Sequence, residues 1–122
     1  VDIDLRLPVG PEVLAGSTRL KSGTVTKMAL NILSTGVMVK LGKVYGNRMV
    51  DVSVTNTKLH DRALRIITAL TKLSRAEAEA LLNRSEQQVK LALLMHWTNL
   101  DKDAAQAALK QHDGYLRQAI ES

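Results

Sequence analysis

The chain has no cysteine and no phenylalanine, and its aromatic side chains are one tryptophan and two tyrosines. The absence of cysteine excludes disulfides, thiolate nucleophiles and thiolate-ligated metals from this chain. The absence of phenylalanine leaves Leu, Val, Ile, Met and Ala to build the core. The length of 122 residues corresponds to one domain, or one and a fraction, and the apolar residues, 45% of the chain, are enough for a core.

Long apolar runs and blocks of charge are missing as well. No stretch of 18 residues is free of polar groups and no signal peptide is recognisable, so we expect a cytoplasmic protein with no membrane partner. Lys and Arg outnumber Asp and Glu by 17 to 12, and the net charge of +5 suits an anionic partner. The cations are scattered and are not interleaved with aromatic residues, so nucleic acid is not an expected partner.

The first nine residues, VDIDLRLPV, alternate apolar and polar side chains. This period of two predicts a β-strand over 1–9 with one covered face, and Pro8 ends the strand or places it at an edge. A single strand cannot satisfy its own backbone, and no later segment provides a convincing sheet. Since the chain begins at Val1 and not at methionine, we expect the missing strands to come from upstream sequence or from another chain.

The stretch 10–27, GPEVLAGSTRLKSGTVTK, is the main candidate for a binding site. It gathers glycines, hydroxyls and cations, namely Gly10, Gly16, Gly23, Ser17, Thr18, Ser22, Thr24, Arg19, Lys21 and Lys27. A glycine-rich turn at a helix N-terminus can direct backbone N–H groups at an anion, while hydroxyl and ammonium groups add donors and charge. We therefore predict that the turn binds a phosphate group. The alternative is a plain strand-to-helix connection with solvated charges.

The residues alone leave the roles of individual side chains in this turn open. Glu12 could act as a base, accept a hydrogen bond from a substrate hydroxyl, or pair with Arg19. Ser17 and Thr18 could donate to a ligand or cap the following helix. Arg19 and Lys21 could contact a phosphate or remain solvated.

A long helix is predicted to begin between Ser17 and Thr24 and to run to about Val44. Residues 28–41 are apolar nearly all round, which is typical of a helix buried on most sides. The polar residues Thr24, Lys27, Asn31, Ser34 and Thr35 form one stripe, which either lines a cleft or helix seam or consists of satisfied buried groups. A chain without its sheet would expose this helix, so we predict self-association through it, with a homodimer as the expected assembly.

The remainder is predicted to be helical. Gly46-Asn47 breaks the first helix, residues 48–55 fit a strand or a helix equally, and Asn56 or Thr57 caps a helix that runs to about Lys72. Its buried stripe is predicted to be Leu59, Ala63, Ile66, Leu70 and Leu73. Capping boxes at Ser74–Glu77 and Ser85–Gln88 introduce short helices over roughly 75–83, 86–97, 102–111 and 114–121.

The last fifty residues contain a repeat with an offset of 27. Ala78, Ala80, Leu82 and Ala92 recur as Ala105, Ala107, Leu109 and Ala119. Two helical hairpins related in this way can pack their apolar stripes into a small bundle. We therefore predict three parts: residues 1–46, an interface helix over 47–73, and a helical-bundle domain over 74–122. His60, His96 and His112 are far apart and lack ligand spacing, so no metal site is predicted.

Three segments, 10–27, 30–52 and 55–66, together resemble the N-acetylmuramic acid 6-phosphate etherases and their relative, the glucokinase regulatory protein. The pattern GPE-x-x-x-GSTRLK-x-G matches the signature of that group almost letter for letter. The likeness covers most of residues 1–72 and continues more loosely through LKQHDGYLRQAIE. A more distant likeness is to the sugar isomerase (SIS) domain at large.

This resemblance implies a lyase of peptidoglycan recycling that converts N-acetylmuramic acid 6-phosphate to N-acetylglucosamine 6-phosphate and D-lactate. It implies elimination through the open-chain sugar with two glutamates as acid and base, no metal or organic cofactor, and a dimer. The implied fold is a parallel sheet flanked by helices. This chain, mostly α, would then be the C-terminal end of an α/β SIS domain followed by a helical cap.

The resemblance also assigns residues. Ser17, Thr18, Arg19 and Lys21 would lie at the rim of the sugar-phosphate site, and Glu12 matches the glutamate of the GPE motif. The two catalytic glutamates of the family belong to a part not present here, so no catalytic residue is assigned and the chain alone is predicted to be inactive. Two alternatives stay open: a non-catalytic sugar-phosphate sensor, and a helical dimerisation module with no intact ligand site.

Overall fold

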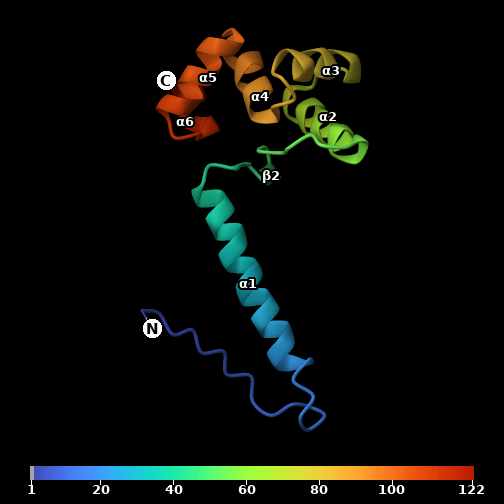
Figure 1. Ribbon diagram of the computed structural model, residues 1–122, viewed down its shortest axis with the longest axis vertical. Helices are drawn as coiled ribbons and strands as arrows, with labels where there is room; N and C mark the ends of the chain where they lie inside the picture. Colours follow the sequence, from blue (N-terminus) through green and yellow to red (C-terminus); the bar gives the residue numbers. More distant parts are fainter. Residues whose placement is uncertain (1) are drawn as a thin grey trace. The chain divides into compact units, whose positions relative to one another are not determined.

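The computed structural model describes residues 2–122, and within that range it is mostly helical (Figure 1). The helices are α1 (Lys21–Lys40), α2 (Thr57–Thr71), α3 (Arg75–Arg84), α4 (Val89–Thr98), α5 (Lys102–Gln111) and α6 (Leu116–Glu121). The chain forms two compact units, a first that ends at Val37 and a second over Met38–Ser122. The prediction of a mostly α chain is confirmed.

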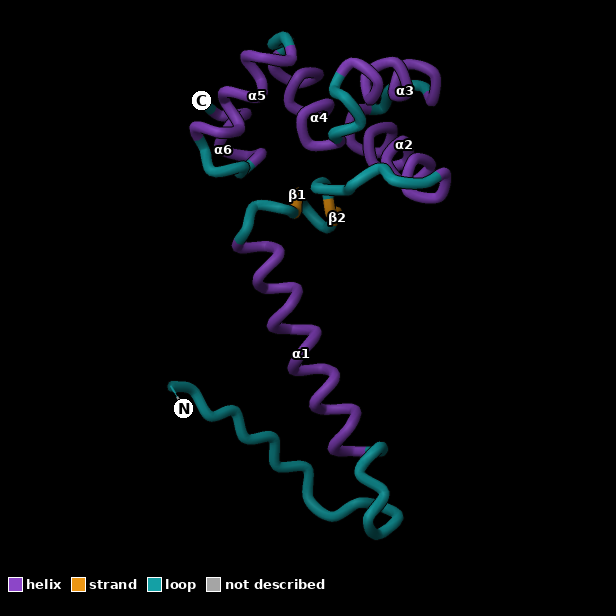
Figure 2. The backbone as a smooth tube through the Cα atoms, viewed as in Figure 1, coloured by secondary structure: helices purple, strands orange, loops and turns teal. Residues whose placement is uncertain are grey.

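Residues 2–20 form loops and turns, drawn as a continuous loop in Figure 2. The strand predicted over 1–9 is therefore wrong for residues 2–9, and Val1 lies outside the described residues. Ile3 and Leu5 are 85% and 59% exposed, so the alternating side chains have no covering layer. A strand needs a neighbour for its backbone hydrogen bonds, and the part of the chain that the structure describes provides no parallel sheet.

Helix α1 ends at Lys40, a few residues before the predicted end near Val44, because Gly42 stops it. The Gly42 N–H donates to the Val39 carbonyl and the Lys43 N–H to the Met38 carbonyl, both at 3.1 Å. Together with a φ of +65° at Gly42, these two bonds form a Schellman cap, which satisfies carbonyls that a helix end leaves free. The prediction that Gly46-Asn47 ends the helix is wrong.

Gly46 and Asn47 instead form the turn of a small hairpin. Strands β1 (Val44–Tyr45) and β2 (Arg48–Met49) pair antiparallel, with Val44 opposite Met49 and Tyr45 opposite Arg48. Gly46 has a φ of +58°, which the first position of a two-residue hairpin turn accepts readily when it is glycine. Of the ambiguous residues 48–55, the first two form β2 and the rest have no regular structure.

Helices α2 to α6 share one core around α4. Helix α4 packs against α2, α3, α5 and α6, and six of its ten residues are buried. Helix α2 is capped by Asn56, whose Oδ1 accepts the Leu59 N–H at 2.9 Å, as predicted. The predicted stripe includes the buried Ala63 and Ile66 but omits Leu64 and Ile67, which are also buried.

The predicted repeat is present in the backbone of this second unit. Ser74 and Asp101, 27 residues apart, are the N-caps of α3 and α5. The turn Ser85–Gln88 joins α3 to α4, and the turn His112–Tyr115 joins α5 to α6 with the same pattern of backbone hydrogen bonds. Each turn holds two consecutive residues with positive φ. The two halves are therefore the same helical hairpin, used twice.

One of the two predicted capping boxes is present. At Ser74 the hydroxyl accepts the Glu77 N–H at 3.3 Å and the Glu77 carboxylate accepts the Ser74 N–H at 2.8 Å. The second, at Ser85–Gln88, is wrong. Ser85 is buried and donates its hydroxyl to the Leu82 carbonyl at 2.9 Å, because it closes α3 and does not open α4.

Candidate functional site

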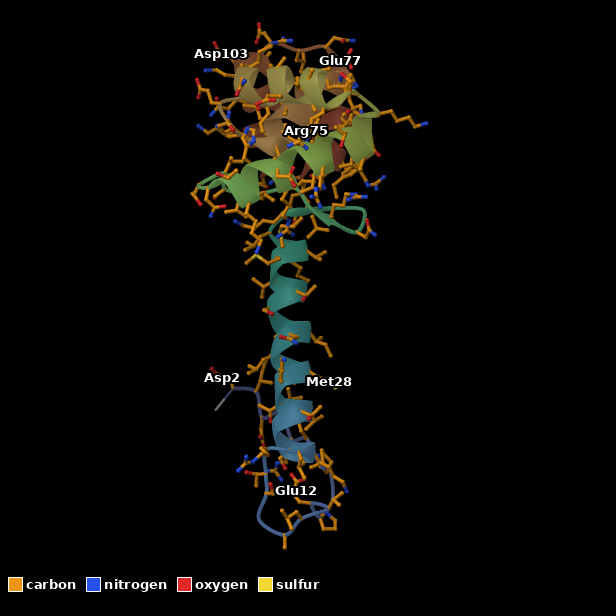
Figure 3. All side chains as sticks on the ribbon, turned by 90° about the vertical axis from the view of Figure 1, so that its right-hand side faces the viewer. Asp2, Glu12, Met28, Arg75, Glu77 and Asp103 are labelled. Atoms are coloured by element: carbon orange, nitrogen blue, oxygen red, sulfur yellow. The ribbon has the colours of Figure 1, made fainter. Side chains whose placement is uncertain are left out.

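Glu12 closes the turn that runs from Gly10 to Ser22, and Figure 3 shows its side chain beside the first turn of α1. Its carboxylate accepts the Lys21 N–H on Oε2 at 2.9 Å and the Ser22 N–H on Oε1 at 3.0 Å. The Lys21 ammonium donates to the Pro11 carbonyl at 2.8 Å. The two ends of the turn are thus joined by three hydrogen bonds between residues nine or ten positions apart.

The backbone inside the turn is held by its own short-range hydrogen bonds. The Ser17 N–H donates to the Leu14 carbonyl at 3.0 Å, the Thr18 N–H to the Gly16 carbonyl at 3.1 Å, and the Leu20 N–H to the Ser17 carbonyl at 3.3 Å. Gly16 has a φ of +79°, a conformation that glycine adopts without steric cost. The turn is therefore a defined structure and not an open loop.

The predicted site residues Ser17, Thr18 and Arg19 follow one another in the second half of this turn and form the segment called the crest. Thr18 and Arg19 are exposed and Ser17 is half-buried. Among residues 2–122, none of their side chains takes part in a hydrogen bond or ion pair, so Arg19 is not the partner of Glu12, which was one predicted possibility. Two hydroxyls and a guanidinium are thus available on one short segment.

The helix N-terminus itself is already occupied by protein groups. Lys21 and Ser22 donate to Glu12, the Gly23 N–H donates to the Thr18 carbonyl at 2.7 Å, and the Thr24 N–H to the Leu20 carbonyl at 3.1 Å. The first three are donors that an α-helix leaves free at its start, and the fourth makes the first hydrogen bond within the helix. The anion at the start of α1 is thus the carboxylate of Glu12.

Hydrogen bonds from the Ser22 and Lys21 backbone N–H groups lower the pKa of Glu12 below its ordinary value of 4.5. These bonds are made to the ionised form, which they stabilise. The carboxyl is therefore ionised at neutral pH and holds its lone pairs toward two donors. A side chain in this state is poorly suited to act as a general acid.

The three histidines do not form a site. His96 lies in the last turn of α4 and His112 caps the C-terminal end of α5, while His60 lies on α2 and is half-buried. Residues 2–122 contain no group of three or more His, Asp or Glu side chains placed to hold a metal ion. In the same range, no helix has both the length and the apolarity that crossing a membrane requires.

A hollow in the second unit has no counterpart among the predictions made from the sequence. It has a volume of about 660 Å³ and lies between the segment Asp51–Thr55, the start of α4 and one side of α5. Lys90 lines it, donates to the Gly114 carbonyl at 3.0 Å, and has its pKa lowered mainly by burial. The repeat offered the only signal, since Lys90 corresponds to Arg117 in the second hairpin.

Comparison with known proteins shows which proteins the chain is similar to. Relatives named N-acetylmuramic acid 6-phosphate etherase match it at 73% identity in Crocosphaera subtropica, 72% in Rippkaea orientalis and 68% in Trichodesmium erythraeum. These matches cover 99–100% of this chain but only 40% of each relative, so the chain spans about two fifths of the length of the curated relatives it matches. The resemblance to the etherases is confirmed.

A family description fits the second unit specifically. Residues 46–112 match the C-terminal lid domain of glucokinase regulatory protein, and this range includes the hairpin turn, α2, α3, α4 and α5. The match extends over more than half of the chain, and it falls on the helices that share one core. The chain therefore belongs to the family of the C-terminal lid domain of glucokinase regulatory protein.

Proposed function

We propose that this chain is part of a lyase that cleaves the D-lactyl ether of N-acetylmuramic acid 6-phosphate to N-acetylglucosamine 6-phosphate and D-lactate. The observation that carries the proposal is the identity of 68–73% with relatives named as this etherase, which extends over the whole chain. The role of the chain would be to hold one side of the sugar-phosphate site.

The Gly10–Ser22 turn is the proposed point of contact with the substrate. Ser17 and Thr18 would donate hydroxyl hydrogen bonds and Arg19 a guanidinium, whose planar fork suits phosphate oxygens. Lys21 and Glu12, the other two predicted site residues, complete the turn. The exposed positions of Thr18 and Arg19 support this arrangement.

The acid and base of the elimination are proposed to lie outside this chain. A general acid at neutral pH needs a carboxyl with a raised pKa. The carboxyls whose pKa is shifted here, Glu12, Asp61 and Glu77, are all shifted downward by hydrogen bonds and by cations. We therefore expect the chain alone to release no D-lactate.

A chimera tests this proposal directly. The first three fifths of the Crocosphaera relative would be joined to this chain, and D-lactate release from N-acetylmuramic acid 6-phosphate would be measured. We expect activity in the chimera, and a loss of about tenfold or more with Arg19→Ala, because a charge-assisted hydrogen bond to phosphate contributes on the order of 1.5–3 kcal/mol. Arg84→Ala, an exposed arginine in α3, is the matched control. An inactive but folded chimera would contradict the proposal.

Two other candidates each have an observation in their favour. A non-catalytic sugar-phosphate sensor is favoured by the family match to a regulatory protein, and sugar binding by the chimera without lactate release would support it. A dimerisation module is favoured by the exposed apolar side chains of α1. The parallel SIS sheet, the homodimer and the cytoplasmic location stay predictions, and so does the division of the chain at residues 46 and 73.

A further inference from the structure

The start of α1 differs from an ordinary anion-binding helix terminus. Such a terminus offers free backbone N–H groups to a ligand, but here the Gly23 N–H is used by the Thr18 carbonyl and those of Lys21 and Ser22 are used by Glu12. An incoming phosphate could bind these donors only by displacing the Glu12 carboxylate. The internal anion and an external one therefore compete for the same position.

The geometry points to Glu12 as a positioning residue for the turn, and not as a ligand contact or a catalytic group. Both of its oxygens are engaged, one with each of two successive N–H groups at 2.9 and 3.0 Å. Lys21 reinforces the closure through Pro11 at 2.8 Å. Between these anchors lie the eight residues 13–20, which carry Ser17, Thr18 and Arg19 at their crest.

Gly23 shows how closely the closed turn packs on α1. A Cβ atom built at Gly23 would lie 3.2 Å from the Thr18 carbonyl oxygen, the same oxygen that accepts the Gly23 N–H at 2.7 Å. The carbonyl of Thr18 is thus fixed against the helix while its side chain faces outward. Closure of the turn by Glu12 therefore determines the positions of the Ser17 and Thr18 hydroxyls and of the Arg19 guanidinium.

The role of Glu12 in closing the turn does not depend on the proposed function. Only the identity of the ligand that the crest binds rests on that function. This assignment divides the five predicted site residues into two groups with different tasks. Glu12 and Lys21 hold the turn, and Ser17, Thr18 and Arg19 remain to contact the phosphorylated sugar. The phosphate is then bound by side chains at the crest and not by the helix N-terminus.

The closure is tested by nuclear magnetic resonance on this chain without any sugar. The amide signals of Lys21 and Ser22 are followed as the pH is lowered from neutral. Because the pKa of Glu12 is lowered, both amides should shift together with one midpoint below the ordinary glutamate pKa of about 4.5. Their hydrogen exchange should accelerate about tenfold or more in Glu12→Ala and less in Glu12→Gln, which keeps one acceptor oxygen. Glu79→Ala, at an exposed position in α3, should change neither amide.

The second part of the experiment is a titration with inorganic phosphate, followed through the same amide signals. In the unmodified chain it should leave the Lys21 and Ser22 amide signals in place, and in Glu12→Ala it should shift them, because the vacated donors become available. The inference is overturned if phosphate shifts these amide signals in the unmodified chain. It is also overturned if the signals do not change when Glu12 is protonated. A chimera that releases no D-lactate, with both amide results as expected, would instead remove the proposed function alone.

Discussion

Helices α1 and α4 are both rich in apolar side chains but have opposite surroundings. Helix α4 is buried along most of its length and touches four other helices, whereas α1 has no buried residue. Ile32, Leu33 and Val37 of α1 are 70%, 56% and 54% exposed. An apolar sequence therefore indicates that a helix is stabilised by burial. Whether its side chains are buried within the chain depends on the elements that pack against it.

The pattern typical of a helix buried on most sides is not matched by burial in α1, which agrees with the expectation that a chain without its sheet would expose this helix. A helix that is apolar all round needs cover on several faces, and the described residues bury none of its side chains completely. Monomeric proteins rarely leave so many adjacent apolar side chains in water. The exposed surface of α1 is the feature that the following experiments probe.

The largest expected difference between the two helices is the response to a truncated leucine. Leu93→Ala in α4 removes a side chain that is 0% exposed and should lower the free energy of unfolding by about 2–5 kcal/mol. Leu33→Ala in α1, which is 56% exposed, should change it by about 0.5 kcal/mol or less. Urea unfolding, measured at a concentration at which the chain is monomeric, gives both values. Equal losses would show that α1 is covered after all.

Self-association through α1 is the next effect in size. We predict that the chain forms a dimer at micromolar concentration by burying α1 against a second copy. Ile32→Glu should weaken this dimer at least tenfold, or about 1.4 kcal/mol, because it places a charge in the apolar contact. Sedimentation velocity measures the association, and Ala104→Glu, an exposed position of α5, is the control. A chain that stays monomeric at this concentration contradicts the prediction.

The sequence was most informative where a local rule decides the structure. The N-caps at Asn56 and Ser74 and the 27-residue repeat depend on hydrogen bonds within a few residues, and all three are present. The failures need information from elsewhere. The strand over 2–9 lacks partners, and Ser85 has the spacing of a capping box but is buried by the packing of α3 against α4.

The candidate site shows the same limit. Its residue types and glycines were visible in the sequence, and Glu12 was assigned to it through the GPE motif. Its partners were not predictable, because the Lys21 and Ser22 N–H groups donate to Glu12 from nine and ten residues away. The path between them depends on the positive φ value at Gly16. Pairing with Arg19 was one of three roles left open for Glu12, whereas in the structure its partners are backbone N–H groups.

The smallest effect concerns a glycine inside α1. Gly36 has ordinary helical φ, and a Cβ atom added there meets nothing within 4 Å, so Gly36→Ala introduces no clash. Alanine is favoured over glycine in a helix interior by about 1 kcal/mol, and the substitution should slow hydrogen exchange of the neighbouring α1 amides by up to about fivefold. The reverse change in α4, Ala92→Gly at a position that is 0% exposed, should destabilise the whole second unit, because that helix unfolds together with its core. If Gly36→Ala instead disrupts dimerisation, glycine at this position serves the close approach of a second helix, and the exposed surface of α1 is an interface built around it.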